Sequence, residues 1–458
     1  MAPVNRVPSE ILALIPDFWN KYLDNRRRDL IALTHVCQAW REVFISRSSL
    51  WTDLDCENED ETRIYLERSG SLPVNLTLET DDQLPFHHPF SKIIPHAIGR
   101  VRSLTILGTP ENLQDITAHL SRPAPLLEKL WIRGGYYKAP HLNPMLTPTL
   151  LGGDLSSLRR LRLASVNTGL PWRNMVNLTT FTLLNPSPGK VSIKQLLDFF
   201  ESAPRLRKVE LESATPTSGA QNGRLVSLAC LEWMGTTGGG SASLLLDHLL
   251  IPVGAHLDIE IELPIPQTGD HPSRFLDNLR NFQNSTDVNL RISKLYTRME
   301  FFGPNGLVGM TPRSPQVDKT RLVLESLNQF DPSKVERLTI DRGAFSPRHP
   351  PYRALLLMKH LRTLTLDHCA NPHIFVQALH LTKSSPRTLA CPELEELIIV
   401  PDGGTLDMES VTEVAAARAS RGAKLKTIRI VGQDQPARAD VLELEKHVFH
   451  VECGPDVD

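Results

Sequence analysis

The chain has 458 residues, beyond the roughly 250–300 at which a single compact core stops growing, so we expect several domains or one elongated repeat array. Lysine and arginine total 50 against 52 aspartate and glutamate, and this near balance argues against a protein that coats nucleic acid or an anionic membrane. Six cysteines without a Cys-x-x-Cys pair are too few for a disulfide scaffold, and neither a signal-like apolar start nor an apolar run long enough for a membrane span occurs. These features predict a protein of the cytoplasm, the nucleus or both.

Residues 7–51 predict a small helical module that is rich in apolar side chains. Pro8 suits a first helical position, and apolar residues follow at helical spacing as far as Tyr22, with an end or kink expected at Pro16. So small a module cannot bury all of its apolar side chains by itself, so they are either covered by the rest of the chain or offered to a partner. A second helix carries the apolar residues Leu30, Leu33, Val36, Cys37, Trp40 and Phe44, three or four positions apart.

Three blocks of this module follow a known pattern. They are Val7-Pro8-Ser9-Glu10-Ile11-Leu12, the run from Leu33 through Val36-Cys37 to Trp40-Arg41, and the pair Leu50-Trp51. The combination resembles an F-box, whose family pattern is Leu-Pro-x-Glu-[Ile/Leu/Val]-Leu, then Leu-x-x-Val-Cys-x-x-Trp, then Leu-Trp. The resemblance implies that residues 5–55 bind the small adaptor subunit that links such receptors to a cullin scaffold. The positions that it assigns to the adaptor are Val7, Pro8, Ile11, Leu12, Leu33, Val36, Cys37 and Trp40. The stretch from Tyr65 to Leu76 resembles the sequel seen in the large basidiomycete F-box families.

The rest of the chain repeats a hexad of the form Leu-x-x-Leu-x-Leu. Nine copies occur, five between Val101 and Leu211 and four between Val335 and Ile430, at intervals of 20–33 residues within each group. The second and third apolar residues of a hexad share one face of a short strand, and one strand cannot bury that face alone, so neighbouring copies must stack into a common parallel sheet. Leucine-rich repeats have periods of about 20–29 residues, and the array resembles irregular leucine-rich repeats of the F-box type.

The segments between hexads predict helices on the other side of this sheet. Ser192 is placed to cap a helix with apolar residues from Ile193 to Phe200, and 112–120, 373–381 and 408–419 predict further helices. Residues 213–334 break the rhythm, and we expect irregular repeats with insertions in the same array, with a separate subdomain as the alternative. Their composition predicts loops at 213–216, 235–241 and 301–319, strands at 244–250, 257–263 and 288–292, and a helix at 274–282.

No pattern of reactive residues stands out. The glycine-rich stretch 235–241 lacks the Gly-Lys-[Ser/Thr] of a phosphate-binding loop, so a flexible loop is favoured. His368-Cys369 with His373, and His447-x-x-His450-x-x-Cys453, lack the paired short spacings of a structural zinc site. No common hydrolase, metalloprotease or dinucleotide-binding motif occurs. We therefore expect no catalytic residue, no metal and no cofactor, and an enzyme whose site is assembled from distant residues stays open as an alternative.

The positions that flank the core leucines of the hexads offer a candidate binding surface. They point away from the core, and in the first group several of them are basic and lie beside one exposed tryptophan. This pattern indicates either an ordinary solvated face or a groove for an acidic or phosphorylated segment of a target protein. The candidate target-binding residues are Lys129, Trp131, Arg133, Arg160, Arg162 and Lys208.

The sequence therefore predicts an α/β protein: an F-box helical module at 5–55, a linker helix at 56–70, an irregular leucine-rich-repeat solenoid at 71–452 with insertions at 213–334, and an acidic tail at 453–458. In the solenoid the parallel sheet lies inside and the helices and loops lie outside. The resemblance implies a non-catalytic substrate-recognition subunit of a cullin-based, F-box-type ubiquitin ligase. Its partners are then the adaptor and an unknown target protein on the repeat face, and not nucleic acid or a membrane. The alternative is a leucine-rich-repeat interaction scaffold whose N-terminal helices are only a cap.

Overall fold

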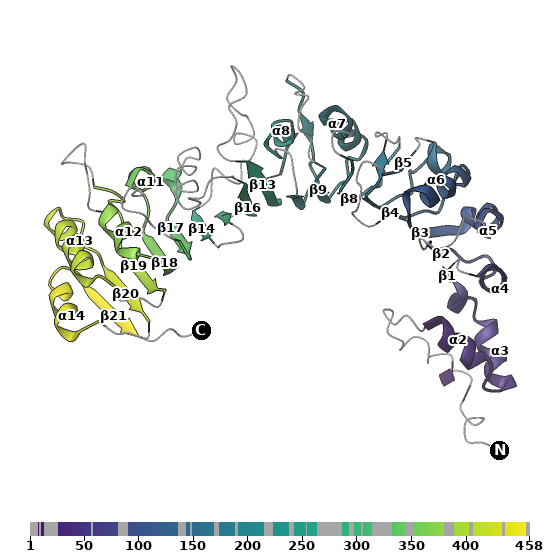
Figure 1. The fold of residues 1–458 in the computed structure, drawn as a ribbon, viewed down its shortest axis with the longest axis horizontal. Helices are drawn as coiled ribbons and strands as arrows, with labels where there is room; N and C mark the ends of the chain where they lie inside the picture. Colours follow the sequence, from purple (N-terminus) through teal and green to yellow (C-terminus); the bar gives the residue numbers. More distant parts are fainter. Residues whose placement is uncertain are drawn as a thin grey trace. The chain divides into compact units, whose positions relative to one another are not determined.

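The chain forms two compact units, Met1–Leu206 (unit 1) and Arg207–Asp458 (unit 2). Both are mixed α/β, with mostly parallel strands joined through helices and loops (Figure 1). The computed structural model describes residues 8, 11–12, 26–55, 58–80, 90–135, 143–146, 149–168, 174–187, 191–214, 223–237, 242–252, 254–262, 286–292, 297–303, 306–313, 332–343, 352–379, 389–402, 406–432 and 436–454.

Six strands of unit 1 form a parallel sheet in which sequence order is also spatial order. Apolar side chains at alternate positions are buried on one face, as Leu104 and Ile106 are in the third of these strands. Beside the sheet, β5 (Met145–Leu146) pairs with β7 (Asn167–Thr168). The six strands are β1 (Asp53–Asp55), β2 (Val74–Glu79), β3 (Val101–Gly108), β4 (Lys129–Gly134), β6 (Arg160–Ala164) and β8 (Thr180–Leu184).

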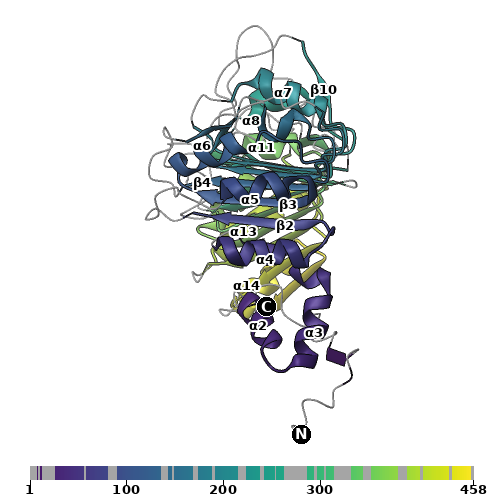
Figure 2. The same cartoon turned by 90° about the vertical axis from the view of Figure 1, so that its right-hand side faces the viewer.

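Helices cover the apolar face of this sheet. Helices α5 (Phe90–Ala97) and α6 (Pro110–His119) lie on one side of β3 and β4, and Figure 2 shows α4 (Glu59–Arg68) and α5 in front of β2 and β3. Short 3-10 turns at Ile98–Arg100 and Leu150–Gly153 lead towards strands. Helix α7 (Ile193–Ser202) begins at a capping box formed by Ser192 and Gln195, and its Phe199 ring lies 4.3 Å from that of Phe181 in β8.

The N-terminal helices of unit 1 differ from the expected pair. Pro8 starts a turn in which the Leu12 amide donates to its carbonyl. The predicted second helix is two helices, α2 (Arg26–Thr34) and α3 (Gln38–Ser46), followed by a 3-10 turn at Ser48–Trp51. The chain is extended at Cys37, and the guanidinium Nε of Arg41 donates to the free Thr34 carbonyl at the end of α2. One continuous apolar stripe from Leu30 to Phe44 was therefore the wrong expectation.

Unit 2 also has one dominant sheet, with a single reversal of direction. The strands pair in the order β9, β11, β13, β16, β15, β14, β17, β18, β19, β20, β21, and all neighbours are parallel except that β15 is antiparallel to both β14 and β16. The small strands β10 (Val226–Ser227) and β12 (Leu249–Leu250) pair separately. The strand bounds are β9 (Lys208–Glu212), β11 (Trp233–Thr237), β13 (His256–Glu262), β14 (Asp287–Ile292), β15 (Thr297–Gly303), β16 (Gly306–Arg313), β17 (Arg337–Asp341), β18 (Thr363–Cys369), β19 (Glu396–Pro401), β20 (Thr427–Val431) and β21 (His450–Gly454).

The helices of unit 2 lie along one side of its last strands. Figure 1 places α12 (Pro372–Ala378), α13 (Met408–Ser420) and α14 (Arg438–Glu445) on the same side of β18 to β21. Helix α8 (Ala242–Leu246) packs near β13, and α11 (Tyr352–Leu357) contacts α12 and the 3-10 turn at Pro332–Lys334. The sheet of each unit is thus covered by helices on one face, and the other face carries the polar alternate positions of its strands.

All nine hexads form strands, and the helices expected near 112–120, 192–200, 373–381 and 408–419 are present as α6, α7, α12 and α13. Three expectations in 213–334 were wrong in whole or in part. Residues 301–303 and 306–313 belong to strands β15 and β16 and not to a loop, and 244–250 contains the end of a helix and a two-residue strand. Gly235–Thr237 belongs to β11, and Cys453 and Gly454 belong to β21 and not to a tail. Val7, the helix with Pro16 and Tyr22, residues 238–241, the helix at 274–282 and the tail residues 455–458 lie outside the described residues.

Candidate functional site

The residues predicted to bind an adaptor divide into exposed and buried members. Ile11 is 53% and Val36 is 45% exposed, and Pro8 is exposed as well. Leu33 and Cys37 are half-buried, whereas Leu12 and Trp40 are buried. The exposed side chains can therefore contact another protein, whereas the buried ones support the helices that carry them.

Aromatic contacts fix α3 to the following turn and to α4. The rings of Trp40 and Phe44 pack edge to face with centroids 5.8 Å apart. The indole nitrogen of Trp51 donates to the Phe44 carbonyl at 2.9 Å, and the same ring packs edge to face on Tyr65 with centroids 4.8 Å apart. The guanidinium of Arg68 lies 4.2 Å from the centre of the Trp51 ring. Trp40 therefore belongs to the internal packing of this segment more than to its surface.

Strands β4 and β6 bring five of the six predicted target-binding residues together. Their register places Lys129 opposite Arg160 and Trp131 opposite Arg162, and all four side chains alternate with buried leucines and isoleucines. The Arg162 guanidinium lies 5.0 Å from the centre of the Trp131 ring. Arg133 follows two positions later on β4 and is half-buried. We call the surface formed by Lys129, Trp131, Arg160 and Arg162 the basic face.

Lys208, the sixth predicted residue, belongs to unit 2. It starts β9, where the register places it opposite Trp233, and its ammonium group lies 4.6 Å from the centre of that ring. Trp233 in turn covers Gly235, because a Cβ at that glycine would lie 2.3 Å from the indole. This local packing explains why a glycine stands in a buried strand position, which sequence reasoning had interpreted as part of a loop.

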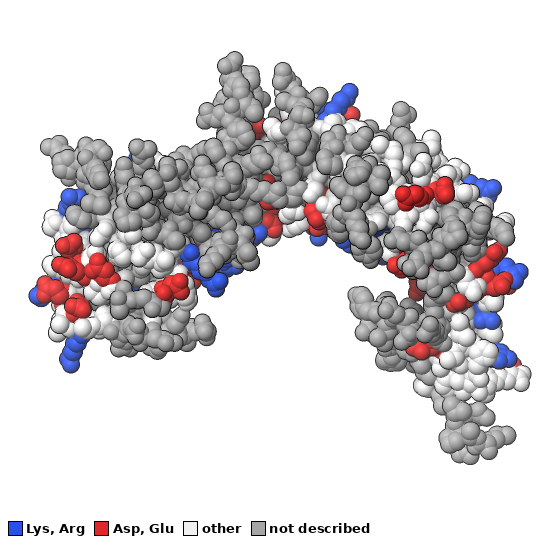
Figure 3. All heavy atoms as spheres, viewed as in Figure 1, with Lys and Arg blue, Asp and Glu red and all other residues white. Residues whose placement is uncertain are grey.

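On the polar strand face of unit 2, arginines are neutralised by carboxylates on neighbouring strands. Three arginines pair with carboxylates directly opposite them in the sheet: Arg291 with Asp341 at 2.9 Å, Arg337 with Asp287 at 2.7 Å, and Arg429 with Glu452 at 2.7 Å. The hydrogen bond that the Arg337 guanidinium donates to Asp287, together with the negative charge of that carboxylate, raises the pKa of Arg337. In Figure 3 basic side chains gather at the lower edge below β14 and β17, with acidic side chains beside them on the side of β18 and β19.

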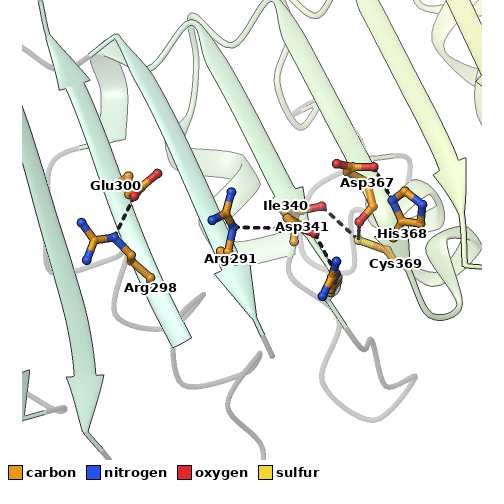
Figure 4. Close-up of polar contacts among 9 residues, drawn as sticks. Arg291, Arg298, Glu300, Ile340, Asp341, Asp367, His368 and Cys369 are labelled. Atoms are coloured by element: carbon orange, nitrogen blue, oxygen red, sulfur yellow. Dashed lines mark hydrogen bonds and ion pairs between the residues drawn. The ribbon is translucent and has the colours of Figure 1, made fainter. Parts of the chain in front are cut away.

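Strands β13 and β15 carry a further, half-buried ion-pair group that was not predicted from the sequence. Arg298 donates to Asp258 at 2.9 Å and to Glu300 at 2.7 Å, and Figure 4 shows it beside the Arg291–Asp341 pair. A Cβ at Gly309 would lie 2.6 Å from the Arg298 guanidinium, so the glycine makes room for it. Opposite charges on adjacent strands are the sequence feature that could have indicated these ion pairs. The feature is useful only when the register of the strands is known.

Nothing among the described residues has the arrangement of a reactive centre. Burial raises the pKa of the Cys369 and Cys391 thiols to about 12 each, which makes them poor nucleophiles at neutral pH. The Cys369 thiol donates to the Ile340 carbonyl at 3.1 Å (Figure 4). In the part of the chain that the structure describes, no three histidine, cysteine or carboxylate side chains are grouped as metal ligands.

Comparisons with known proteins add no identity. The sequence matches no protein-family model, and no curated protein is significantly similar to it. Within the described segments, each helix is too short or too polar to cross a lipid bilayer.

Proposed function

We propose that this chain is the substrate-recognition subunit of a cullin-based, F-box-type ubiquitin ligase. Residues 5–55 form the F-box module and dock the adaptor, and a leucine-rich-repeat array in the remainder holds the target protein. Such a receptor needs no reactive residue, because tethering the target beside the ubiquitin carrier turns a dilute encounter into a nearly intramolecular one. The partner subunits carry out ubiquitin transfer.

The exposure of Ile11 and Val36 is the observation that carries this proposal. Both residues occupy positions of the F-box pattern, and both leave large apolar side chains in contact with water, at 53% and 45% exposure. Isolated exposed apolar residues are common on protein surfaces, but these two coincide with a motif whose function is to bind another polypeptide. A module that served only as a cap would bury these side chains against its own chain.

The regular strand pattern supports the repeat array. Each of the nine hexads forms a strand with its fourth and sixth residues facing the helix-covered side, as Leu338 and Ile340 do in β17. Consecutive hexads pair in parallel and in register from β3 to β8 in unit 1 and from β17 to β20 in unit 2, for example Leu364 opposite Leu397 in β18 and β19. Cys369 completes the repeat consensus and is 1% exposed, which fits a core position in such a repeat.

Capture of purified adaptor by the full chain tests the proposal. Val36→Asp and Ile11→Asp place a charge at the exposed positions, so each should weaken adaptor binding at least about tenfold, because burying such a side chain is worth about 1.5–3 kcal/mol. The matched control is Ile64→Asp on α4, whose side chain is 39% exposed but lies outside the pattern, and it should bind adaptor like the wild type. Trp40 is a poor probe, because it is 8% exposed and its loss would disturb folding.

Two outcomes would contradict the proposal. If the wild-type chain captures no adaptor, the protein is better interpreted as an interaction scaffold with N-terminal capping helices. If the wild type binds the adaptor and Val36→Asp and Ile11→Asp bind it as well as the control Ile64→Asp does, the adaptor contact lies outside the F-box pattern. Circular dichroism melting of each variant separates loss of binding from loss of folding.

A further inference from the structure

The basic face on unit 1 carries an excess of positive charge that its own sheet does not balance. Strands β3, β4, β6 and β8, with the residue before β4 and β6, hold six basic residues and one carboxylate, Glu128. Glu128 already pairs with Arg102 at 3.0 Å. Among the described residues, Lys129, Arg160 and Arg162 take part in no ion pair, and all three are exposed.

The register makes this excess more pronounced. Lys129 stands directly opposite Arg160, so two cations face each other across strands about 5 Å apart, an arrangement that costs stability in a sheet. The other neighbour of Arg160 is Thr180, which is uncharged. On the far side of Lys129 the register places Ser103. The row therefore presents two cations flanked by hydroxyl groups, and every one of these groups can donate a hydrogen bond to an anion.

In unit 2, arginines at equivalent positions on the polar strand face are neutralised by carboxylates. There Arg291, Arg337 and Arg429 each have a carboxylate directly opposite them, at 2.7–2.9 Å. The positions opposite Arg160 and Arg162 in unit 1 hold a lysine, a tryptophan and two threonines instead. The basic face thus lacks the carboxylates that accompany arginines elsewhere on the polar strand faces.

We propose that the basic face binds an extended, acidic peptide segment whose aspartate and glutamate carboxylates pair with Arg160, Arg162 and Lys129. Charged hydrogen bonds from guanidinium to carboxylate are the strong kind, and the internal pairs of unit 2 show the chain forming them across neighbouring strands. An extended segment of eight residues spans roughly 25 Å, enough to cross all four strands. The inference rests on the proposed function only in calling this segment a target, because peptide binding itself needs no adaptor.

A peptide fits this surface better than a nucleic acid does. The one aromatic ring of the basic face, Trp131, has the Arg162 guanidinium 5.0 Å from its centre and is only half exposed, so it offers no open platform for stacking a base. The unpaired cations are confined to two adjacent strands, whereas a phosphate backbone requires a track of basic residues. The chain as a whole carries a net charge of -2.

Fluorescence anisotropy with the purified full chain and labelled octa-glutamate tests the inference. Octa-glutamate should bind, octa-glutamine should not, and added salt should weaken the binding because exposed charges are screened. Arg160→Glu and Arg162→Glu should each reduce affinity at least about tenfold, since each removes a charged hydrogen bond and adds repulsion. Arg160→Gln should give a smaller loss than Arg160→Glu. The matched control is Arg63→Glu on α4, which makes the same change in net charge at an exposed site and should leave binding unchanged.

Three results would overturn the inference. Octa-glutamate and octa-glutamine could bind equally, the two glutamate variants could bind like the wild type while melting normally, or another ligand could be preferred. For the last case, a doubly phosphorylated serine peptide and a single-stranded oligouridylate are titrated in parallel, and tighter binding of either identifies a different partner class. Because the adaptor is absent, failure of this experiment leaves the ligase proposal untouched, and failure of adaptor capture leaves this result untouched.

Discussion

At the scale of single residues, the most deeply buried charged side chain among the described residues of unit 2 has a structural role. Arg418 on α13 is 0% exposed, and its two terminal nitrogens donate to the carbonyls of Ala390 and Cys391, each at 2.8 Å. Burial lowers the pKa of Arg418, but the two charged hydrogen bonds hold the guanidinium in place. The fork of the side chain therefore fastens α13 to the turn that leads into β19.

Replacing this guanidinium should be costly. Arg418→Met keeps most of the side-chain volume but leaves two buried carbonyls without donors, so we expect unit 2 to lose about 2–4 kcal/mol of stability. Arg418→Lys should recover part of the loss, because one ammonium cannot occupy both acceptor positions in the planar geometry of the fork. Urea denaturation followed by circular dichroism measures both. Arg421→Met, at the exposed end of the same helix, is the control and should change stability by less than about 0.5 kcal/mol. A small effect of Arg418→Met would mean that water or a neighbouring donor replaces the guanidinium.

At the scale of elements, the start of α13 is tied to α12 by a chain of polar contacts. The Asp407 carboxylate accepts from the Ser410 backbone at 3.2 Å and from its hydroxyl at 2.6 Å, and that hydroxyl accepts from Gln377 on α12 at 2.8 Å. The side-chain hydrogen bond from Ser410 is the main reason that the pKa of Asp407 is lowered. The cap thus orders the beginning of one helix and contacts the next.

This cap gives a stability contribution with a defined pH dependence. Because the folded pKa of Asp407 lies below its ordinary value, the contribution is complete above the ordinary range of an aspartate and is lost as the pH falls through the folded pKa. Asp407→Ala should cost about 1 kcal/mol at neutral pH. Asp407→Asn can still cap the helix but cannot titrate. The difference in unfolding free energy between the wild type and this variant should therefore be constant near neutral pH, and the wild type should lose stability relative to the variant in acid. A difference that is independent of pH down to acid unfolding would contradict this role.

The elements that the sequence predicted best are those whose burial pattern is local. Ser192 and the apolar spacing after it specify α7, and each hexad encodes its own strand, because two residues on one face must be buried whatever the partner is. The β15–β16 hairpin was missed because its glycines and prolines are typical of turns, and its stability comes from antiparallel pairing such as Met299 with Met310. The break between α2 and α3 was missed because helical spacing continues across Cys37 although the backbone does not.

The candidate site was predicted only in part, for a related reason. Alternation along β4 and β6 is enough to place Arg160 and Arg162 on the polar face, but which charges remain unbalanced depends on the residues opposite them. That register is set by contacts between segments some 20–30 residues apart, so a single sequence does not display it. The same limit applies to Arg298, whose partner Asp258 is 40 residues away.

At the scale of the whole molecule, the overall charge balance conceals an uneven distribution. The net charge of -2 suggests a surface of mixed charge, and on the strands of unit 2 arginines and carboxylates indeed neutralise each other. On β4 and β6 the same alternation leaves cations unpaired. The N-terminal helices add a second unsatisfied surface, which is apolar and not charged. Two surfaces of different chemistry would allow the proposed receptor to hold two different partners.

Substitutions on one surface should therefore affect binding at that surface only. Val36→Asp should weaken adaptor capture at least about tenfold and leave octa-glutamate binding unchanged. The combined Arg160→Glu, Arg162→Glu variant should weaken octa-glutamate binding and leave adaptor capture unchanged. Raising the salt concentration should separate them as well: charge pairing at the basic face weakens as the Debye length falls from about 8 Å at physiological ionic strength to about 3 Å at 1 M, while the apolar contact at Val36 persists. Both readouts are taken on the same full-length preparations, with pull-down for the adaptor and anisotropy for the peptide. Loss of both activities in either variant would mean that the surfaces are one site or that the substitution disturbs the fold, and a normal melting curve would decide for the first.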